Sequence, residues 1–267
     1  MTSLTLYIDA VGLCGPGLEN WAAAQPVLRE DVPYVANPSV ITPSSFLPAA
    51  ERRRVGVAVK LALATATDAL QKSHHQANAL LSVFSSSGGD GDNCHVICEA
   101  LASDDRLISP TRFTNSVHNA PSGYWGIALQ AKPASTSLCA YDGSFSAGFL
   151  EACTQAKTAN APVLLIAYDT PYPEPLRATR PIAHSLGIAL VIAPVPTAST
   201  LAKVSVSLGQ RTASTMRNPE LEALRCNVPA ARGLPLLQAI ASGLVATSIV
   251  LDLFDNQQLL LDVSTAL

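Results

Sequence analysis

SLCAYDGSFSAGFLEACTQA, residues 137–156, is the stretch that decides the fold. It predicts a short strand over Thr136–Ala140, a turn through Tyr141–Ser144 and a helix over Gly143–Ala159. The first turn of a helix carries unpaired backbone N–H groups and a partial positive charge. A carboxylate is stabilised at such a place, so we expect Asp142 to cap this helix. A covalent role for the same carboxylate is the alternative interpretation.

Strands and helices alternate on both sides of this stretch. Residues 162–169 (PVLLIAYD) are continuously apolar, as expected of a strand buried on both faces. Further strands are predicted at Leu4–Val11, Ala79–Phe84, Ile188–Ala193 and Val204–Leu208, with a hairpin from Thr247–Phe254 to Leu259–Val263. Further helices are predicted at Leu18–Ala24, Glu51–Lys72, Asp92–Ala102, Pro121–Gln130, Glu220–Leu224 and Pro235–Ser242, and a loop at Ser109–Phe113. This alternation favours a layered α/β fold.

The chain has few charges for its size. Hydrophobic residues make up 48% of the 267 residues and charged residues 14%, against roughly 25% charged in an average globular protein. Since so few charges cover a surface poorly, we expect a large buried interface with another protein. The net charge of −3 provides no basic face for nucleic acid. The one dense basic run, Arg52–Arg54, is interpreted as a solvated helix start.

The segment Gly233–Leu251 carries no charge and has to be weighed as a membrane span. Pro235 and Gly243 interrupt it, and its last residues have strand character. A helix that ends near Gly243, followed by a buried strand, therefore explains it better than a span does. The N-terminus lacks the basic start of a signal peptide. We expect a cytoplasmic protein without a membrane span.

No motif for a metal or a cofactor stands out. Among the six cysteines, Cys94 and Cys98 share one helical spacing, but no second pair completes a zinc site. The loop at residues 88–91 lacks the lysine of a P-loop and the G-x-G-x-x-G pattern, so it is predicted to be a tight turn. His74 and His75 lie in a polar run and are expected to face solvent. We therefore expect neither a metal nor a cofactor.

Three side chains are candidates for nucleophilic chemistry. Residues 144–148 approximate the G-x-S-x-G elbow around Ser146, but only His184 follows, so the acid and histidine order of a hydrolase fails. Cys139 lies upstream, on the predicted strand. His118 lies in the segment most crowded with polar groups. It is either a base that faces a cavity or an ordinary hydrogen-bonded histidine.

The order of these features resembles the ketosynthases of the thiolase fold. LTLYIDAVGLCGPG (residues 4–17) resembles their first strand and turn, and LLSVFSSSGGDGD (80–92) their second strand and glycine loop. FTNSVHNAPSGYWGIAL (113–129) is similar to the segment beside their active site and dimer interface, and residues 137–156 to the nucleophile strand, turn and helix. The resemblance covers roughly Leu4–Leu208. It is closest to the short ketosynthase-like N-terminal-domain family of aryl-polyene biosynthetic clusters, whose members resemble chain-length factors.

The resemblance implies a thiolase-like layered α/β/α/β/α fold, truncated relative to full ketosynthases. It also implies a single domain over residues 1–267, with 1–210 matching the N-terminal half and 211–267 forming a shortened second half. Two departures matter. Where ketosynthases have their cysteine, this chain has Asp142, or Tyr141 one residue earlier. The two histidine motifs of their second half are missing as well, so the resemblance implies a non-catalytic subunit.

We therefore expect a chain-length-factor subunit that pairs with a full-length ketosynthase in a heterodimer. It would shape the pocket for a growing polyene chain carried on an acyl carrier protein. The residues expected at the interface and the pocket end are Asn115, His118, Asn119, Tyr124, Trp125, Tyr141, Asp142 and Phe145. One alternative is an autonomous acyl-transfer enzyme that uses Cys139 or Ser146 as nucleophile and His118 as base. Another is a homodimeric binding protein for acyl carriers.

Overall fold

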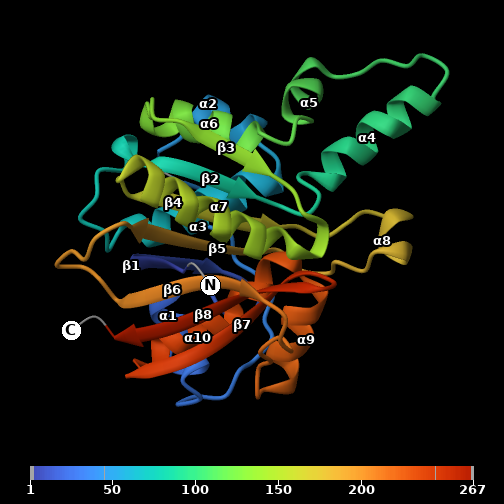
Figure 1. The fold of residues 1–267 in the computed structure, drawn as a ribbon. Helices are drawn as coiled ribbons and strands as arrows, with labels where there is room; N and C mark the ends of the chain where they lie inside the picture. Colours follow the sequence, from blue (N-terminus) through green and yellow to red (C-terminus); the bar gives the residue numbers. More distant parts are fainter. Residues whose placement is uncertain (1–2, 45, 244, 266–267) are drawn as a thin grey trace.

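The computed structural model describes residues 3–44, 46–243 and 245–265. These residues form one eight-stranded sheet in the order β3-β2-β4-β5-β1-β6-β8-β7 (Figure 1). The strands are β1 Leu4–Cys14, β2 Leu81–Ser85, β3 Ser135–Leu138, β4 Val163–Asp169, β5 Leu186–Ala193, β6 Ala202–Gly209, β7 Ala246–Phe254 and β8 Gln257–Thr265. β2 runs parallel to β3 and β4, and the other neighbours are antiparallel.

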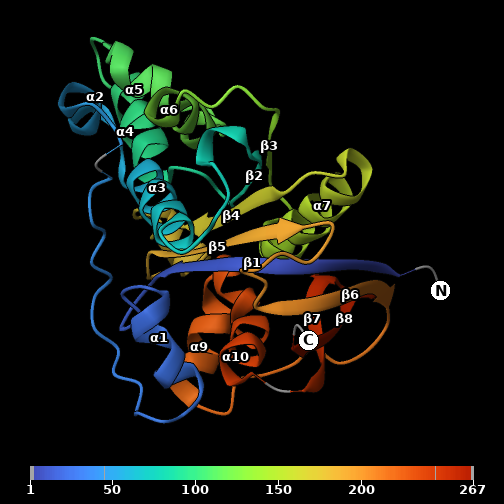
Figure 2. The ribbon, with the colours of Figure 1, turned by 90° about the vertical axis from the view of Figure 1, so that its left-hand side faces the viewer.

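Helices cover both faces of this sheet, as Figure 2 shows. They are α1 Trp21–Leu28, α2 Ala49–Arg54, α3 Val57–Leu70, α4 Gly91–Ala102, α5 Pro110–Asn115, α6 Ala120–Leu129, α7 Ser144–Ala159, α8 Leu176–Thr179, α9 Pro219–Asn227 and α10 Leu234–Ser242. Short 3₁₀ turns lie at η1 Ala77–Ala79, η2 Tyr141–Gly143 and η3 Pro229–Gly233. One core packs α3 and α6 on one face, and a second core packs α7, α10, α1 and α9 on the other.

The strand β4 separates these two cores. All of its residues are buried, and Leu164 and Ile166 face α3 while Leu165 faces α7. The predicted strand buried on both faces is therefore confirmed. The predicted β7–β8 hairpin is confirmed as well, with its turn at residues 255–256. Both predictions rest on local apolar patterns. A strand that is buried on both faces is continuously apolar, and a strand buried on one face alternates between apolar and polar residues.

The sheet bends around α7. This helix contacts both β4 and β7, which are five positions apart in the strand order. On a flat sheet these strands would lie roughly 24 Å apart, since neighbouring strands are spaced by about 4.8 Å. α7 connects β3 and β4, which both run parallel to β2, so its axis runs along the strands and only its width of roughly 10–12 Å lies across the sheet. The two ends of the sheet must therefore fold toward α7. The result is a layered arrangement of helices, sheet, α7 and the second part of the sheet.

The second part of the sheet, β6-β8-β7, has a polar outer face. Val204 and Val206 point into the core around α7, while Lys203 and Ser205 between them do not. Asp262 on β8 is exposed on the same outer side. The layered α/β fold is confirmed, and the fifth, helical layer of the expected α/β/α/β/α arrangement has no counterpart among the described residues.

Three helical predictions need correction. The single helix predicted over Glu51–Lys72 is two helices, α2 and α3, because the backbone at Val55 and Gly56 is extended. The loop predicted at Ser109–Phe113 is mostly the helix α5, which starts at Pro110, a residue well suited to a first helical turn. The helix predicted from Gly143 begins at Ser144, after the 3₁₀ turn η2.

The uncharged segment at residues 233–251 folds as predicted, into a helix that ends near Gly243 and a strand that follows it. α10 ends at Ser242, Gly243 follows with a φ of +57° as its left-handed cap, and β7 begins at Ala246. A positive φ is easily reached by glycine and explains the sharp stop. Among the described residues, no helix has the length and apolar character needed to cross a membrane.

The helices α2, α4 and α5 pack loosely on the rest of the chain. α2 buries none of its residues, α4 buries only Asn93 and α5 only Asn115. Figure 1 shows α4 and α5 standing away from the sheet. A helix normally earns its stability by burying an apolar face. α4 and α5 therefore leave apolar side chains, Leu101 and Phe113, without a cover in the chain alone.

Candidate functional site

The turn between β3 and α7 is built differently from the prediction. Asp142 does not cap α7: the N-cap residue is Gly143, and no side chain caps the helix there. Instead, Oδ1 of Asp142 accepts a hydrogen bond from Arg180 at 2.7 Å. The hydroxyl of Ser144 binds within the turn, donating to the carbonyl of Tyr141 at 2.7 Å. The carboxylate thus reaches outward to an arginine rather than back to its own helix.

The backbone of this turn is tight at two residues. Tyr141 has a φ of +51°, in the left-handed region, which costs a residue with a side chain roughly 1–2 kcal/mol. Gly143 lies so close to β7 that a Cβ placed on it would sit 2.0 Å from the carbonyl oxygen of Leu253. Only glycine fits there, and the turn is therefore pressed against the second part of the sheet.

A chain of ion pairs runs outward from the turn. It passes from Arg180 to Asp142, Arg232, Asp252, Arg225 and Glu222, with separations from 2.7 to 3.6 Å. Hydrogen bonds from Arg225 hold the pKa of Glu222 down at about 2. Sequence reasoning missed this network, because its members come from separate segments that only the fold brings together. The spacing of Glu222 and Arg225 on one helix was its single local sign.

A hollow of about 500 Å³ lies beside the turn. Its walls are Ala140, Tyr141, Asp142, Gly143, Arg232, Asp252, Leu253, Phe254, Asp255 and Gln258. Three of these are aspartates and one is an arginine, so the hollow is charged rather than apolar. An apolar acyl chain would leave these charges without water, which is costly. The hollow is therefore poorly suited to hold such a chain.

A buried carboxylate lies at the carboxyl end of β4. Asp169 is 2% exposed and accepts hydrogen bonds from the backbone N–H and hydroxyl of Ser87 at 2.9 and 2.6 Å. Its other oxygen accepts from the backbone N–H of Ala230 at 2.8 Å. Burial raises its pKa to about 6, against the lowering effect of these hydrogen bonds. Asp169 thus ties the loop after β2 to η3.

The candidate nucleophiles are not paired with the candidate base. The thiol of Cys139 donates to the carbonyl of Ser87 at 3.2 Å, and Nε2 of His118 lies 3.2 Å from the carbonyl of Ser86. Both side chains therefore approach the loop after β2, but no described hydrogen bond joins them. Ser146 is completely buried, and its hydroxyl has no partner among the described residues. A nucleophile activated by a base needs that hydrogen bond.

The segment 115–125 divides into buried and exposed residues. The amide of Asn115 donates to the carbonyl of Arg54 at 2.8 Å and accepts from the hydroxyl of Tyr124 at 2.9 Å, so it joins α2, α5 and α6. Asn119 is exposed. Trp125 is 2% exposed and packs edge-to-face on Phe84. Trp125 therefore belongs to the core and presents no side chain to an interface.

Phe145, expected at the pocket end, also lies inside the core. It is completely buried and stacks on Phe149, with ring centroids 6.3 Å apart. Tyr141 is the one aromatic residue of the turn that is exposed, at 63%. His75, expected in solvent, instead places Nε2 2.8 Å from the buried carboxylate of Asp9. That carboxylate is otherwise shielded inside a bulge of β1, which the sequence pattern did not reveal.

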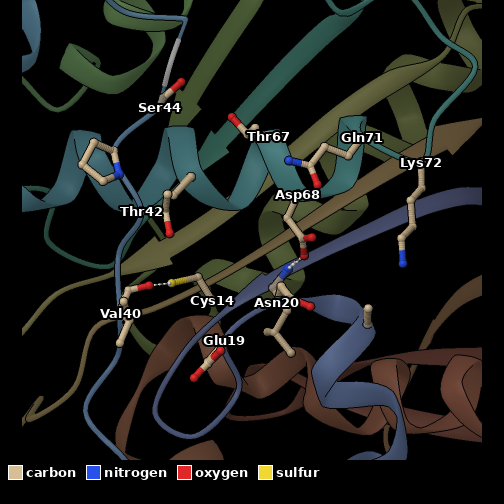
Figure 3. A pocket seen from close by; sticks show the side chains of 14 residues that line it. Cys14, Glu19, Asn20, Val40, Thr42, Ser44, Thr67, Asp68, Gln71 and Lys72 are labelled. Atoms are coloured by element: carbon tan, nitrogen blue, oxygen red, sulfur yellow. Dashed lines mark hydrogen bonds between the residues drawn. The ribbon is translucent and has the colours of Figure 1, made fainter. Parts of the chain in front are cut away.

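A second hollow, of about 450 Å³, lies between the end of β1 and α3 (Figure 3). Asp68 accepts hydrogen bonds there from the backbone N–H groups of Leu13 and Trp21, at 3.0 and 2.7 Å. Cys14 donates its thiol proton to the carbonyl of Val40. Burial raises the pKa of Cys14 to about 11, so its thiol stays protonated and unreactive at neutral pH. These side chains are structural ties. In the part of the chain that the structure describes, no three His, Cys, Asp or Glu side chains gather as metal ligands.

A third hollow, of about 490 Å³, runs between α2, α5 and α6. Its walls are more apolar than those of the other two and include Val117, Ile127 and Tyr124. Val117 and Ile127 are 52% and 55% exposed. α6 also contacts β3, the strand at the edge of the sheet. The groove and the free edge of β3 thus form one continuous end of the molecule, which we call the α6 face.

A protein-family comparison matches residues 20–248 to the model described as beta-ketoacyl synthase, N-terminal domain. The chain belongs to this family. No curated protein matches the chain significantly. The family assignment confirms the resemblance to ketosynthases described in the sequence.

Solved ketosynthase structures have the same fold. A chain of the ketosynthase (ApeO) in complex with its chain length factor (ApeC) from Xenorhabdus doucetiae superposes with a TM-score of 0.74 at 22% identity, covering 97% of this chain and 99% of that one. AntDE:AntF, a type II PKS acyl-carrier protein in complex with its ketosynthase bound to the hexaketide, gives 0.75 at 11%, covering 99% and 100%. The ishigamide ketosynthase/chain length factor gives 0.69 at 12%, covering 98% and 99%. The expected thiolase-like fold is therefore confirmed.

Proposed function

We propose that this family member is a non-catalytic chain-length-factor subunit that pairs with an active β-ketoacyl synthase in polyene biosynthesis of the aryl-polyene type. The observation that carries the proposal is the turn between β3 and α7. Where a ketosynthase needs a cysteine beside a histidine, this turn offers Tyr141 and Asp142, both engaged by Arg180. Condensation requires a thiolate and a stabilised oxyanion. A partner has to supply them.

Of the two residues that compete for the nucleophile position, Tyr141 fits better. It stands at the apex of the turn with a φ of +51°, and a nucleophile at the start of a helix is typically held in such a strained strand-to-helix turn. Asp142 follows it inside η2. We therefore assign the position of the missing cysteine to Tyr141 and regard Asp142 as its anchor.

The α6 face is the surface that we propose for the partner ketosynthase. β3 pairs only with β2 among the described strands, so its outer edge is free to pair with another strand. Beside it, Val117 and Ile127 leave apolar side chains in the open groove. A free edge next to an apolar groove is typical of a protein interface. The similar structures of ketosynthases with chain length factors support this choice of partner.

The direct test of this assembly is co-purification of the chain with the ketosynthase of its own pathway. We expect a stable complex with one copy of each chain, measured by mass photometry or sedimentation. A homodimer that excludes the ketosynthase would instead support the alternative of a binding protein for acyl carriers.

We propose that the acyl carrier protein docks at the rim of the α6 face. Arg52, Arg53 and Arg54 are exposed on α2, which borders the groove, and only Arg54 has an ion-pair partner among the described residues, Glu51 at 3.2 Å. In a chain of net charge −3, three neighbouring arginines form a local basic patch. Such a patch suits a carrier protein with an acidic surface.

Replacing Arg52, Arg53 and Arg54 together with serine is expected to weaken carrier binding to the complex at least tenfold at low salt. The loss should shrink as salt rises, because exposed charges act within a Debye length of about 10 Å at 0.1 M. The matched control replaces the exposed cations Lys157, Lys203 and Arg211 with serine. It should leave the affinity of the complex for the carrier protein unchanged. Equal losses in both variants, measured by fluorescence anisotropy, would show that only net charge matters.

A further inference from the structure

The guanidinium of Arg180 lies over the turn that replaces the nucleophile site. Its carbon is 3.7 Å from the centroid of the Tyr141 ring. One of its nitrogens donates to Asp142 at 2.7 Å, and the ring of Tyr172 flanks it at 5.9 Å. The Arg180 side chain is 14% exposed. A planar cation held on an aromatic face and anchored by a carboxylate has a well-defined position.

The anchor of Arg180 is itself fastened to the second part of the fold. Asp142 also faces Arg232 at 3.6 Å, and Arg232 pairs with Asp252 of β7 at 2.8 Å. The side chains of Arg180 and Arg232 are mostly buried, and the Nε atom of each is enclosed. Two arginines from different segments thus hold one aspartate of the turn. Moving the turn would have to break contacts on both sides.

The space next to the turn does not offer an acyl chain an alternative route. The hollow of about 500 Å³ beside it is walled by Asp142, Asp252 and Asp255. On its inner side, the backbone of Leu253 touches Gly143. With Arg180 above Tyr141, the turn is covered from the direction of α8 as well.

We propose that Arg180 is a positioning residue that keeps this turn closed, so that an acyl thioester does not reach the N-terminal end of α7 in this subunit. The role that we give to this closure rests on the proposed function: the closed turn would confine the acyl chain to the partner and the shared interface. The closure itself is a property of this chain. It can be measured whether or not the proposed function holds.

The test is hydrogen–deuterium exchange of the full chain, read on peptides that contain residues 140–146. Replacing Arg180 with glutamine is expected to speed exchange of these amides at least tenfold. Raising NaCl from 0.05 to 1 M in the wild type should produce part of this effect, because salt screens the pair with the half-exposed Asp142. The matched control is Arg177→Gln on α8, whose side chain is exposed and makes no ion pair with a described residue. It should leave the exchange unchanged.

Two further variants separate closure from general stability. Arg180→Lys keeps the charge but loses the planar face. Its unfolding midpoint should match that of the wild type, whereas exchange at the turn should stay at least threefold faster than in the wild type. Tyr141→Phe keeps the ring and should behave as the wild type, whereas Tyr141→Ala should match Arg180→Gln. Equal exchange in the Arg180→Gln and Arg177→Gln variants would overturn the closure. A lone chain that fails to bind a ketosynthase would overturn only the proposed function.

Discussion

Replacing Ile127 with aspartate is expected to weaken the complex with the partner ketosynthase at least a hundredfold. Ile127 lies 55% exposed in the groove of the α6 face. If a partner covers this groove, the new carboxylate loses its water without gaining a cation, which costs about 3 kcal/mol or more in binding. Because the residue is exposed in the chain alone, the substitution should hardly change the folding of the chain itself.

The matched control for this substitution is Val195→Asp. Val195 is 57% exposed on the connection between β5 and β6, away from the α6 face. The two variants therefore add the same charge at equally exposed aliphatic positions. Affinity should fall only for Ile127→Asp when the dissociation constants are measured by biolayer interferometry. Unchanged binding of Ile127→Asp would place the ketosynthase on another surface.

The second large effect is a pH-dependent loss of stability through Asp169. Burial raises its pKa in the folded chain to about 6 from the ordinary 3.8. Between pH 3.8 and 6 the Asp169 carboxyl is therefore protonated in the folded chain and ionised in the unfolded chain. Stability from this group is therefore fully present below about pH 3.8 and is lost as pH rises through 6. Two pKa units correspond to about 3 kcal/mol.

The pH dependence that a second carboxylate, Glu222, contributes has to be separated from that of Asp169. Glu222, whose pKa is lowered to about 2 by Arg225, has the opposite sign, because its contribution is lost as the pH falls below its ordinary value of 4.5. The comparison with Asp169→Asn isolates the effect, since asparagine does not titrate. Urea unfolding between pH 4 and 7 should show the wild type losing stability relative to this variant. A constant difference across that range would contradict the assignment.

The fold was largely predictable where patterns are local. Residues 163–169 form a buried strand, because a continuously apolar run of that length is typical of a strand that is covered on both faces of the sheet. The stop of α10 followed from Gly243, which takes the left-handed cap conformation. The break between α2 and α3 was missed, because Gly56 alone did not outweigh a long helical pattern on either side. Tertiary contacts, such as those of Asn115 with α2, fix that break.

The sequence predicted where the candidate site lies in the chain but not which side chains contact each other there. The turn at Tyr141 and Asp142 was recognised because strand, small residues and helix follow each other in one segment. Its partners were not, since Arg180 and Arg232 are distant in the sequence and no local rule pairs them with Asp142. The capping role expected for Asp142 failed for the same reason. Two arginines compete for its carboxylate and outweigh the local backbone donors.

We propose that the chemistry belongs to the partner and not to this chain. The most direct measurement is condensation of a carrier-bound acyl group by four preparations: the lone chain, the complex, the complex with its ketosynthase's active-site cysteine replaced by alanine, and the complex with Cys139→Ala in this chain. We expect product from the complex and from its Cys139→Ala form, and none from the lone chain or from the complex whose ketosynthase lacks its cysteine. Product from the lone chain, or loss of product in the Cys139→Ala complex, would contradict it.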